Sequence, residues 1–191
     1  LGTPISSLMA WQEMLRETYP DDELLPEMGK DVERLQRIAE RFSKIGSLPE
    51  LRPESLNEVL SAVTQYISRR ASNRVRLTCT VPQQPLIVPM CSSLCEWVVE
   101  NLCKNAIDAM DGQGSIPLTA STEGALAVVE VADTGKGIPK NKFRTVFTPG
   151  FTTKKRGWGL GLSLAKRIVE EYHHGRIYVK NSEVGRGTTF R

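Results

Sequence analysis

The chain has 191 residues, of which 40% are hydrophobic and 25% are charged, and its formal net charge is +3. This length accommodates one ordinary domain and a small second unit, and the hydrophobic content excludes a disordered polymer. Because no dense basic run is present, we expect no nucleic-acid partner. No apolar stretch approaches the ~20 residues of a membrane span, and we expect no signal peptide within the first residues.

The first 46 residues are expected to form a helical hairpin. One helix is predicted over 5–18, and a second runs from the turn at 19–22 to about Ile45. Both helices carry apolar stripes that are too long for one hairpin to bury, so we expect two copies to dimerise as a four-helix bundle. Packing against the chain's own second domain is the alternative. The stripes comprise Ile5, Leu8, Met9 and Leu15, and then Met28, Val32, Leu35, Phe42 and Ile45.

A Gly-Ser-Leu-Pro sequence at 46–49 marks the expected boundary between a domain of residues 1–46 and a domain of residues 47–191. The second domain mixes hairpins with helices, which is typical of an α+β sandwich with helices on one face of a mixed sheet. One predicted helix is capped by Ser55 and runs to about Arg70. Others run from Ser92 or Ser93 to about Met110 and from Leu160 to about Tyr172. Strands are predicted at 75–81, 86–88, 115–122, 125–132 and 177–179.

Two asparagines lie on the predicted helix that begins at Ser92. Asn101 and Asn105 are four residues apart and therefore share one face of the helix. Amide oxygens on one face can coordinate a hard cation such as Mg²⁺. Alone, the pair is weak evidence, because exposed asparagines are common on helices.

The predicted strand 125–132 leads into a carboxylate and two glycines, in the sequence Asp133-Thr134-Gly135-Lys136-Gly137-Ile138. An ionised aspartate accepts a hydrogen bond from an exocyclic amine such as that of adenine. Glycines allow a flat ring to approach the backbone. An ordinary turn that contains an aspartate is the alternative interpretation.

A basic, glycine-rich loop precedes the last predicted helix. It runs from Phe147 through Lys154 and Lys155 into Gly157-Trp158-Gly159-Leu160-Gly161-Leu162. Backbone N–H groups at a helix start bind anions, and a mobile glycine-rich loop is typical of a lid over a nucleotide. The P-loop pattern and the Rossmann fingerprint are both absent.

In this order the segments resemble the sensor histidine kinases, a branch of the Bergerat-fold ATPases and kinases. The resemblance covers about Glu50 to Arg191 and implies a Bergerat-type α/β sandwich. The matching segments are 101–106 for the N box, 133–138 for the G1 box, 147–151 for the F box, 157–162 for the G2 box and 187–190 for the closing strand, which is expected to be truncated.

The resemblance implies a site for ATP and Mg²⁺. Asp133 would accept the adenine amine, and Asn105, helped by Asn101, would hold Mg²⁺ against the phosphates. Many members of the family carry a basic residue where this chain has Asp108, so Lys154 or Lys155 is expected to supply the phosphate contact instead. The other implied nucleotide-binding residues are Gly135, Gly137, Ile138, Gly157, Gly159, Leu160, Gly161, Leu162 and Thr188.

The start of the chain resembles the tail of the family's phosphoacceptor motif, H-E-L-R-T-P-L. Residues 1–5 match it with Gly2 in place of Arg, and this register places the acceptor histidine two residues before Leu1. We therefore expect a piece of a longer protein that cannot autophosphorylate by itself. Thr3 falls four residues after that histidine. Family members with Thr or Asn there can also dephosphorylate their regulator; capping of the helix is the alternative role.

The implied function is transfer of the ATP γ-phosphate to a histidine, followed by relay to an aspartate on a response-regulator receiver domain. The resemblance also implies a homodimer located in the bacterial cytoplasm. Other parts of the longer parent protein could anchor it in the inner membrane. The alternatives are a Bergerat-fold ATPase and a serine kinase of the anti-sigma type. Such an ATPase places a Glu base four residues before the metal-binding Asn, where this chain has Asn101. Glu100 lies one step away, about 100° around the helix.

Overall fold

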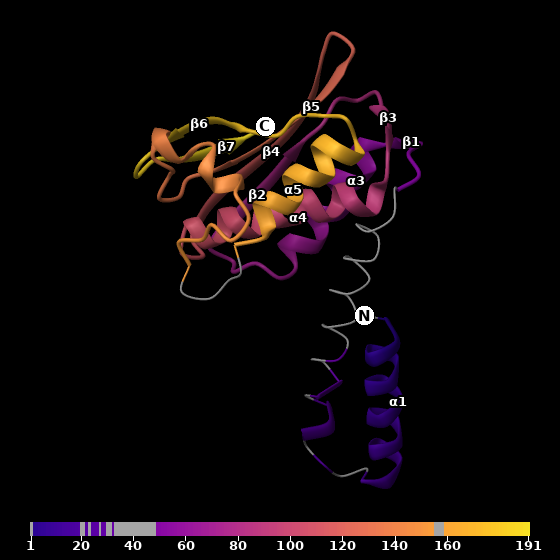
Figure 1. Ribbon diagram of the computed structural model, residues 1–191. Helices are drawn as coiled ribbons and strands as arrows, with labels where there is room; N and C mark the ends of the chain where they lie inside the picture. The colour runs from indigo at the N-terminus through magenta and orange to yellow at the C-terminus, as the bar shows by residue number, and fades with distance from the viewer. Residues whose placement is uncertain are drawn as a thin grey trace. The chain divides into compact units, whose positions relative to one another are not determined.

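The computed structural model describes residues 2–19, 22, 24–26, 28–29, 32, 49–154 and 159–191, with side chains in the first helix from Ser7 onward. The chain divides into two compact units, Leu1–Pro49 and Glu50–Arg191 (Figure 1). None of the described helices is long and apolar enough to cross a membrane.

The first unit contains helix α1 (Gly2–Thr18), which confirms the helix predicted over 5–18 and begins three residues earlier. Gln12 Nε2 donates a hydrogen bond to the backbone oxygen of Leu25 at 3.4 Å, so this helix contacts the segment that follows it. That segment is helical at 24–26, 28–29 and 32. The rest of the second predicted helix lies outside the described residues, as do Leu35, Phe42 and Ile45.

The second unit is built on a five-stranded mixed sheet with the order β2-β4-β5-β7-β6. Strand β2 is parallel to β4, and the other neighbours are antiparallel. Helices α3, α4 and α5 cover one face (Figure 1), which confirms the predicted α+β layering. The strands are β2 (Val75–Thr80), β4 (Gly114–Glu123), β5 (Leu126–Asp133), β6 (Val179–Glu183) and β7 (Gly187–Phe190), and the helices are α3 (Leu56–Ser68), α4 (Ser92–Ala109) and α5 (Gly161–Arg167).

The core lies between the helices and the sheet. In β4 the buried side chains alternate along the strand, as a sheet with one covered face requires. In α3 the buried residues recur at three- and four-residue steps, and the Ser55 hydroxyl caps the helix by accepting the Glu58 N–H. Full burial of a large aliphatic side chain contributes about 1.5–3 kcal/mol. The fully buried large side chains include Leu60, Met90, Ile116, Leu118, Val131 and Ile168.

His173, which is 82 residues from Cys91 in the chain, forms a hydrogen bond at the start of helix α4. The Cys91 N–H donates to His173 Nε2 at 3.1 Å, and His173 Nδ1 lies 2.8 Å from the Ile168 carbonyl oxygen. These two contacts require the neutral imidazole with its proton on Nδ1. His173 therefore joins the N-terminal end of α4 to the helical segment after α5.

Several elements differ from the sequence prediction. Strands β1 (Arg52–Ser55) and β3 (Ile87–Met90) form a separate antiparallel pair, and only β3 overlaps a predicted strand. The strand predicted at 177–179 overlaps β6 only at Val179, where β6 begins. Tyr178, just before it, exchanges backbone hydrogen bonds with Arg191. The last predicted helix is α5 followed by a π-helical segment, η3 (Ile168–Tyr172). Two short 3₁₀ helices, η1 (Lys140–Lys142) and η2 (Thr145–Phe147), form between β5 and the glycine-rich loop, where no helix is predicted.

Candidate nucleotide-binding site

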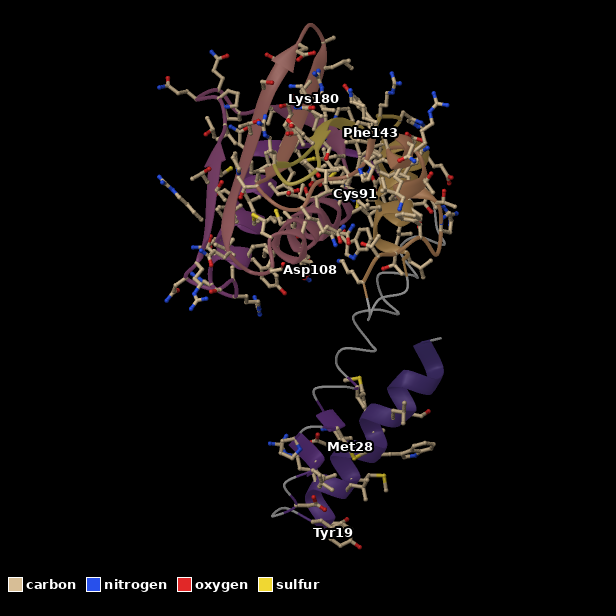
Figure 2. The ribbon with its side chains drawn as sticks, turned by 90° about the vertical axis from the view of Figure 1, so that its left-hand side faces the viewer. Tyr19, Met28, Cys91, Asp108, Phe143 and Lys180 are labelled. Atoms are coloured by element: carbon tan, nitrogen blue, oxygen red, sulfur yellow. The ribbon has the colours of Figure 1, made fainter. Side chains whose placement is uncertain are left out.

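Helix α4 presents Asn101 and Asn105 beside its buried face; Cys91 and Asp108, labelled in Figure 2, mark its start and its last turn. Asn101 is half-buried, and within the described chain its Nδ2 atom is a buried nitrogen without a hydrogen-bond partner. A buried amide nitrogen without an acceptor carries a desolvation cost of about 1–3 kcal/mol. A ligand oxygen at this position would supply the missing acceptor.

The start of α5 meets α4 at the same asparagine. A methyl group at Gly161 would overlap the Asn101 side-chain oxygen, so any larger residue here would have to displace the Asn101 amide. The structure thus brings the first residue of α5 against the N-box face of α4. Leu160 precedes the helix and is 40% exposed, and Leu162 in the first turn is partly buried.

Asp133 ends β5 as a buried carboxylate with 8% of its surface exposed. Its Oδ1 atom accepts the Gly135 N–H at 2.8 Å, and Thr188 is its partner in the register with β7. Burial raises the pKa of Asp133, while hydrogen bonds from the backbone N–H groups of Gly135 and Thr188 act in the opposite direction. The result is an acceptor held in weakly polar surroundings, which suits an amine donor.

The loop after Asp133 is held between α4 and the β6–β7 turn. The Lys136 N–H donates to the Ala109 carbonyl at 2.9 Å, and the Gly185 N–H donates to the Lys136 carbonyl at 2.9 Å. Gly137 has φ +71°, and a side chain there would overlap the backbone of Glu183. The loop that resembles the G1 box is therefore fixed on both sides by backbone contacts.

A buried hydroxyl pair supports this loop and was not predicted from the sequence. Ser182 and Thr188 are 6% and 4% exposed, and their hydroxyl oxygens are 2.9 Å apart. The Ile138 N–H donates to Ser182 Oγ at 2.7 Å. Thr188 was predicted through the closing-strand motif, whereas Ser182 belongs to no motif. A serine in a strand gives no sequence signal of burial.

The loop that resembles the F box returns to α4. Phe147 packs edge-on against Phe190 with ring centroids 6.1 Å apart, and the Gly150 N–H donates to the Gly159 carbonyl at 3.0 Å. At its far end, Lys154 Nζ donates to Asn105 Oδ1 at 2.8 Å and to Asp108 Oδ2 at 2.6 Å.

Contacts therefore link the G1 loop to α4 through Ala109 and to β6 through Ser182, and the start of α5 to α4 through Asn101. Lys155, Gly157 and Trp158 lie outside the described residues. Thr3 belongs to α1, and its side chain is likewise outside them.

A magnesium ion fits these donors only as a partner of the nucleotide. Among the described residues, no three His, Cys, Asp or Glu side chains converge as a metal site. An asparagine oxygen is a hard donor, and Mg²⁺ in phosphate-transfer sites keeps several waters and phosphate oxygens as ligands. Asn105 would thus supply one protein oxygen to a cation that the phosphates also hold.

Comparison with known proteins defines the class to which the site belongs. Residues 92–191 match the family described as histidine kinase-, DNA gyrase B- and HSP90-like ATPases, and the chain belongs to this family. Over 197 aligned residues that include the whole chain, it is 33% identical to the sensor histidine kinase ZraS of Escherichia coli (strain K12). The chain spans 42% of that relative's length.

Solved structures agree with this assignment. The catalytic domain of the histidine kinase ThkA is 29% identical, with a TM-score of 0.67, and the match covers 74% of this chain and 93% of that one. ThkA in complex with the response regulator protein TrrA shares the fold over 99% of this chain and 58% of that one, at 24% identity and a TM-score of 0.66. Within its family, the chain therefore contains an ATPase-type catalytic domain of the sensor histidine kinase class.

Substitution of Ser182 tests the support beneath the G1 loop. Ser182→Ala leaves the Ile138 N–H without its acceptor in a buried region, so the free energy of unfolding should fall by about 1–3 kcal/mol. Urea denaturation measures this change. Ser121→Ala, on the exposed part of β4, is the matched control and should change stability far less. Equal losses in the two variants would contradict the supporting role of Ser182.

Proposed function

We propose that this chain binds ATP together with Mg²⁺ and donates the γ-phosphoryl group to a histidine on the helical hairpin of its parent protein. The observation that carries the proposal is the position of the buried Asp133 carboxylate at the end of β5, beside a loop that contacts the C-terminal end of α4. This arrangement places a hydrogen-bond acceptor for the adenine base near the helix face that carries Asn101 and Asn105.

Each group in the site has a separate task. Asp133 accepts the adenine amine, and Asn105, helped by Asn101, holds Mg²⁺ against the phosphates. When bound, Mg²⁺ neutralises negative charge that develops on the transferred phosphoryl group. Lys154 adds positive charge near the phosphates from the loop, where Asp108 stands in place of a basic residue. The remaining nucleotide contacts are assigned to Gly135, Gly137, Ile138, Gly159, Leu160, Gly161, Leu162 and Thr188, with Lys155 and Gly157 outside the described residues.

The accepting group is a neutral imidazole. Histidine suits this step because its unperturbed pKa is about 6.5, so a ring nitrogen carries a free lone pair at neutral pH. Relay to an aspartate of a response-regulator receiver domain would follow. The ThkA structure, which contains the response regulator protein TrrA, supports this class of partner.

A hydrolytic ATPase mechanism has less support. Its general base would stand four residues before Asn105, and that position is Asn101. The neighbouring carboxylate of Glu100 forms an ion pair with Lys104, one turn further along α4. A paired carboxylate on another part of the helix surface is poorly placed to activate a water for attack.

Replacement of Asp133 tests nucleotide binding. Asp133→Asn puts an amide donor where the adenine amine needs an acceptor, so ATP affinity should fall about 10- to 100-fold, as expected for loss of a hydrogen bond to a charged group. Titration calorimetry with Mg²⁺ present measures the change. Asp111→Asn makes the same charge change at an exposed position and should bind normally. Wild-type affinity in Asp133→Asn would remove this residue from the pocket.

We further propose that residues 1–46 are the dimerising hairpin and residues 47–191 the catalytic domain, with two copies forming a four-helix bundle. Apolar side chains on the described part of the hairpin support this: Trp11, Met14 and Leu24 are 60%, 64% and 71% exposed. Surface of this kind is stabilised when it packs against a second copy. The dimer would lie on the cytoplasmic side of the membrane.

Light scattering tests the dimer. Trp11→Glu would place a charge in the apolar seam, so the variant should be monomeric at concentrations where the wild type has twice the monomer mass. Glu13→Lys, an exposed position on the same helix, should remain dimeric. A monomeric wild type at high protein concentration would count against the bundle.

Thr3 carries a second proposed activity, dephosphorylation of the regulator. Its hydroxyl, one helical turn from the acceptor histidine, would hydrogen-bond a water in line with the aspartyl phosphate of the regulator. In the longer parent protein, Thr3→Ala should lose this phosphatase activity and keep autophosphorylation. Normal phosphatase activity with stability lower by about 1 kcal/mol would instead identify Thr3 as a helix cap.

A further inference from the structure

The ammonium group of Lys154 occupies a position between two oxygen atoms of α4. It lies 2.8 Å from Asn105 Oδ1 and 2.6 Å from Asp108 Oδ2. The side chains of Lys154 and Asp108 are 38% and 54% exposed, so water reaches both partners. The contact joins positions 154 and 108, which are 46 residues apart in the chain.

The oxygen that Lys154 contacts is the one that the proposed function assigns to the metal. Mg²⁺ binds oxygen at about 2.0–2.1 Å with nearly octahedral geometry. A cation at that distance from Asn105 Oδ1 would be repelled by the ammonium held against the same atom. Lys154 must therefore leave Asn105 before Mg²⁺ is bound there.

Asp108 sets the strength of this contact. Asn105 offers Lys154 a neutral oxygen, whereas Asp108 offers a carboxylate, and hydrogen bonds between charged groups are roughly twice as strong as neutral ones. Both α4 residues lie within one helical turn, so a single lysine reaches both. The carboxylate thus keeps the lysine on the metal-binding oxygen.

We propose that Asp108 is a positioning residue that holds Lys154 in the Mg²⁺ position on Asn105 while no nucleotide is bound. Binding of ATP with Mg²⁺ then exchanges one cation for another at this oxygen. The released ammonium pairs with the phosphates in place of Asp108. This inference rests on the proposed nucleotide site. It adds Asp108 as a residue that weakens ATP binding, because Asp108 pairs with Lys154 while the site is empty.

The expected effect is modest and has a definite direction. Exposed ion pairs are worth about 0.2–1 kcal/mol, which corresponds to an affinity change of up to about five-fold. Asp108→Asn should therefore bind ATP with Mg²⁺ about two- to five-fold more tightly than the wild type. Loss of a negative charge near the phosphates would also tighten binding through simple repulsion, so a single variant is insufficient.

A double-mutant cycle separates the two causes. Calorimetric affinities for ATP with Mg²⁺ are measured in the wild type, Asp108→Asn, Lys154→Gln and the double variant. If Asp108 acts by holding Lys154, its substitution should change affinity less than about 1.5-fold when Lys154 is already Gln. Asp111→Asn, the same charge change three residues along the chain, is the matched control and should leave affinity unchanged.

The outcomes are distinct. An equal gain from Asp108→Asn in both backgrounds, or no gain in either, would overturn the positioning role and leave the proposed function intact. Absence of any ATP binding by the wild type would overturn both. A gain that depends on Lys154, and that declines as salt screens the exposed pair, would support the exchange.

Discussion

The burial of one face of α4 is the constraint on which the site depends. Leu94, Val98, Leu102 and Ala106 pack inward at helical spacing, and this fixes the rotation of the helix about its axis. Once that rotation is set, Asn101 and Asn105 share the adjoining face by periodicity alone. Rotation of the helix by one residue would move both amides about 100° away from the start of α5. Packing of the hydrophobic core therefore determines the direction in which Asn101 and Asn105 point.

A second constraint is the cost of placing a carboxylate inside the domain. Asp133 is tolerated at the end of β5 because backbone N–H groups from the following loop and from β7 bond to it. Strands β6 and β7 bury the hydroxyl groups of Ser182 and Thr188, which satisfy each other and the Ile138 N–H. Polar groups at this edge of the sheet thus form one connected set of hydrogen bonds that supports the loop.

Much of this fold could be predicted from the sequence because its signals are local. The alternation in β2, the Ser55 cap of α3 and the length of α4 all follow from side-chain period and capping chemistry, and the structure has each of them. The missed strand β1 contains Pro53 and two charged residues, so it has no strand pattern of its own. Its backbone finds a partner in β3, which only tertiary pairing supplies. The π-helical winding of η3 likewise gives no signal in residue order.

By itself, the sequence determined the class of this protein and the identity of its motifs, since Asn105, Asp133 and the glycines carry chemistry that depends on residue type and spacing. Tertiary structure alone decided which of these groups touch. Gly161 meets Asn101, Ser182 supports Ile138, and Lys154 reaches across to Asn105 and Asp108. Each contact joins segments far apart in the chain, and their approach is set by packing of helices on the sheet, which residue order does not encode locally.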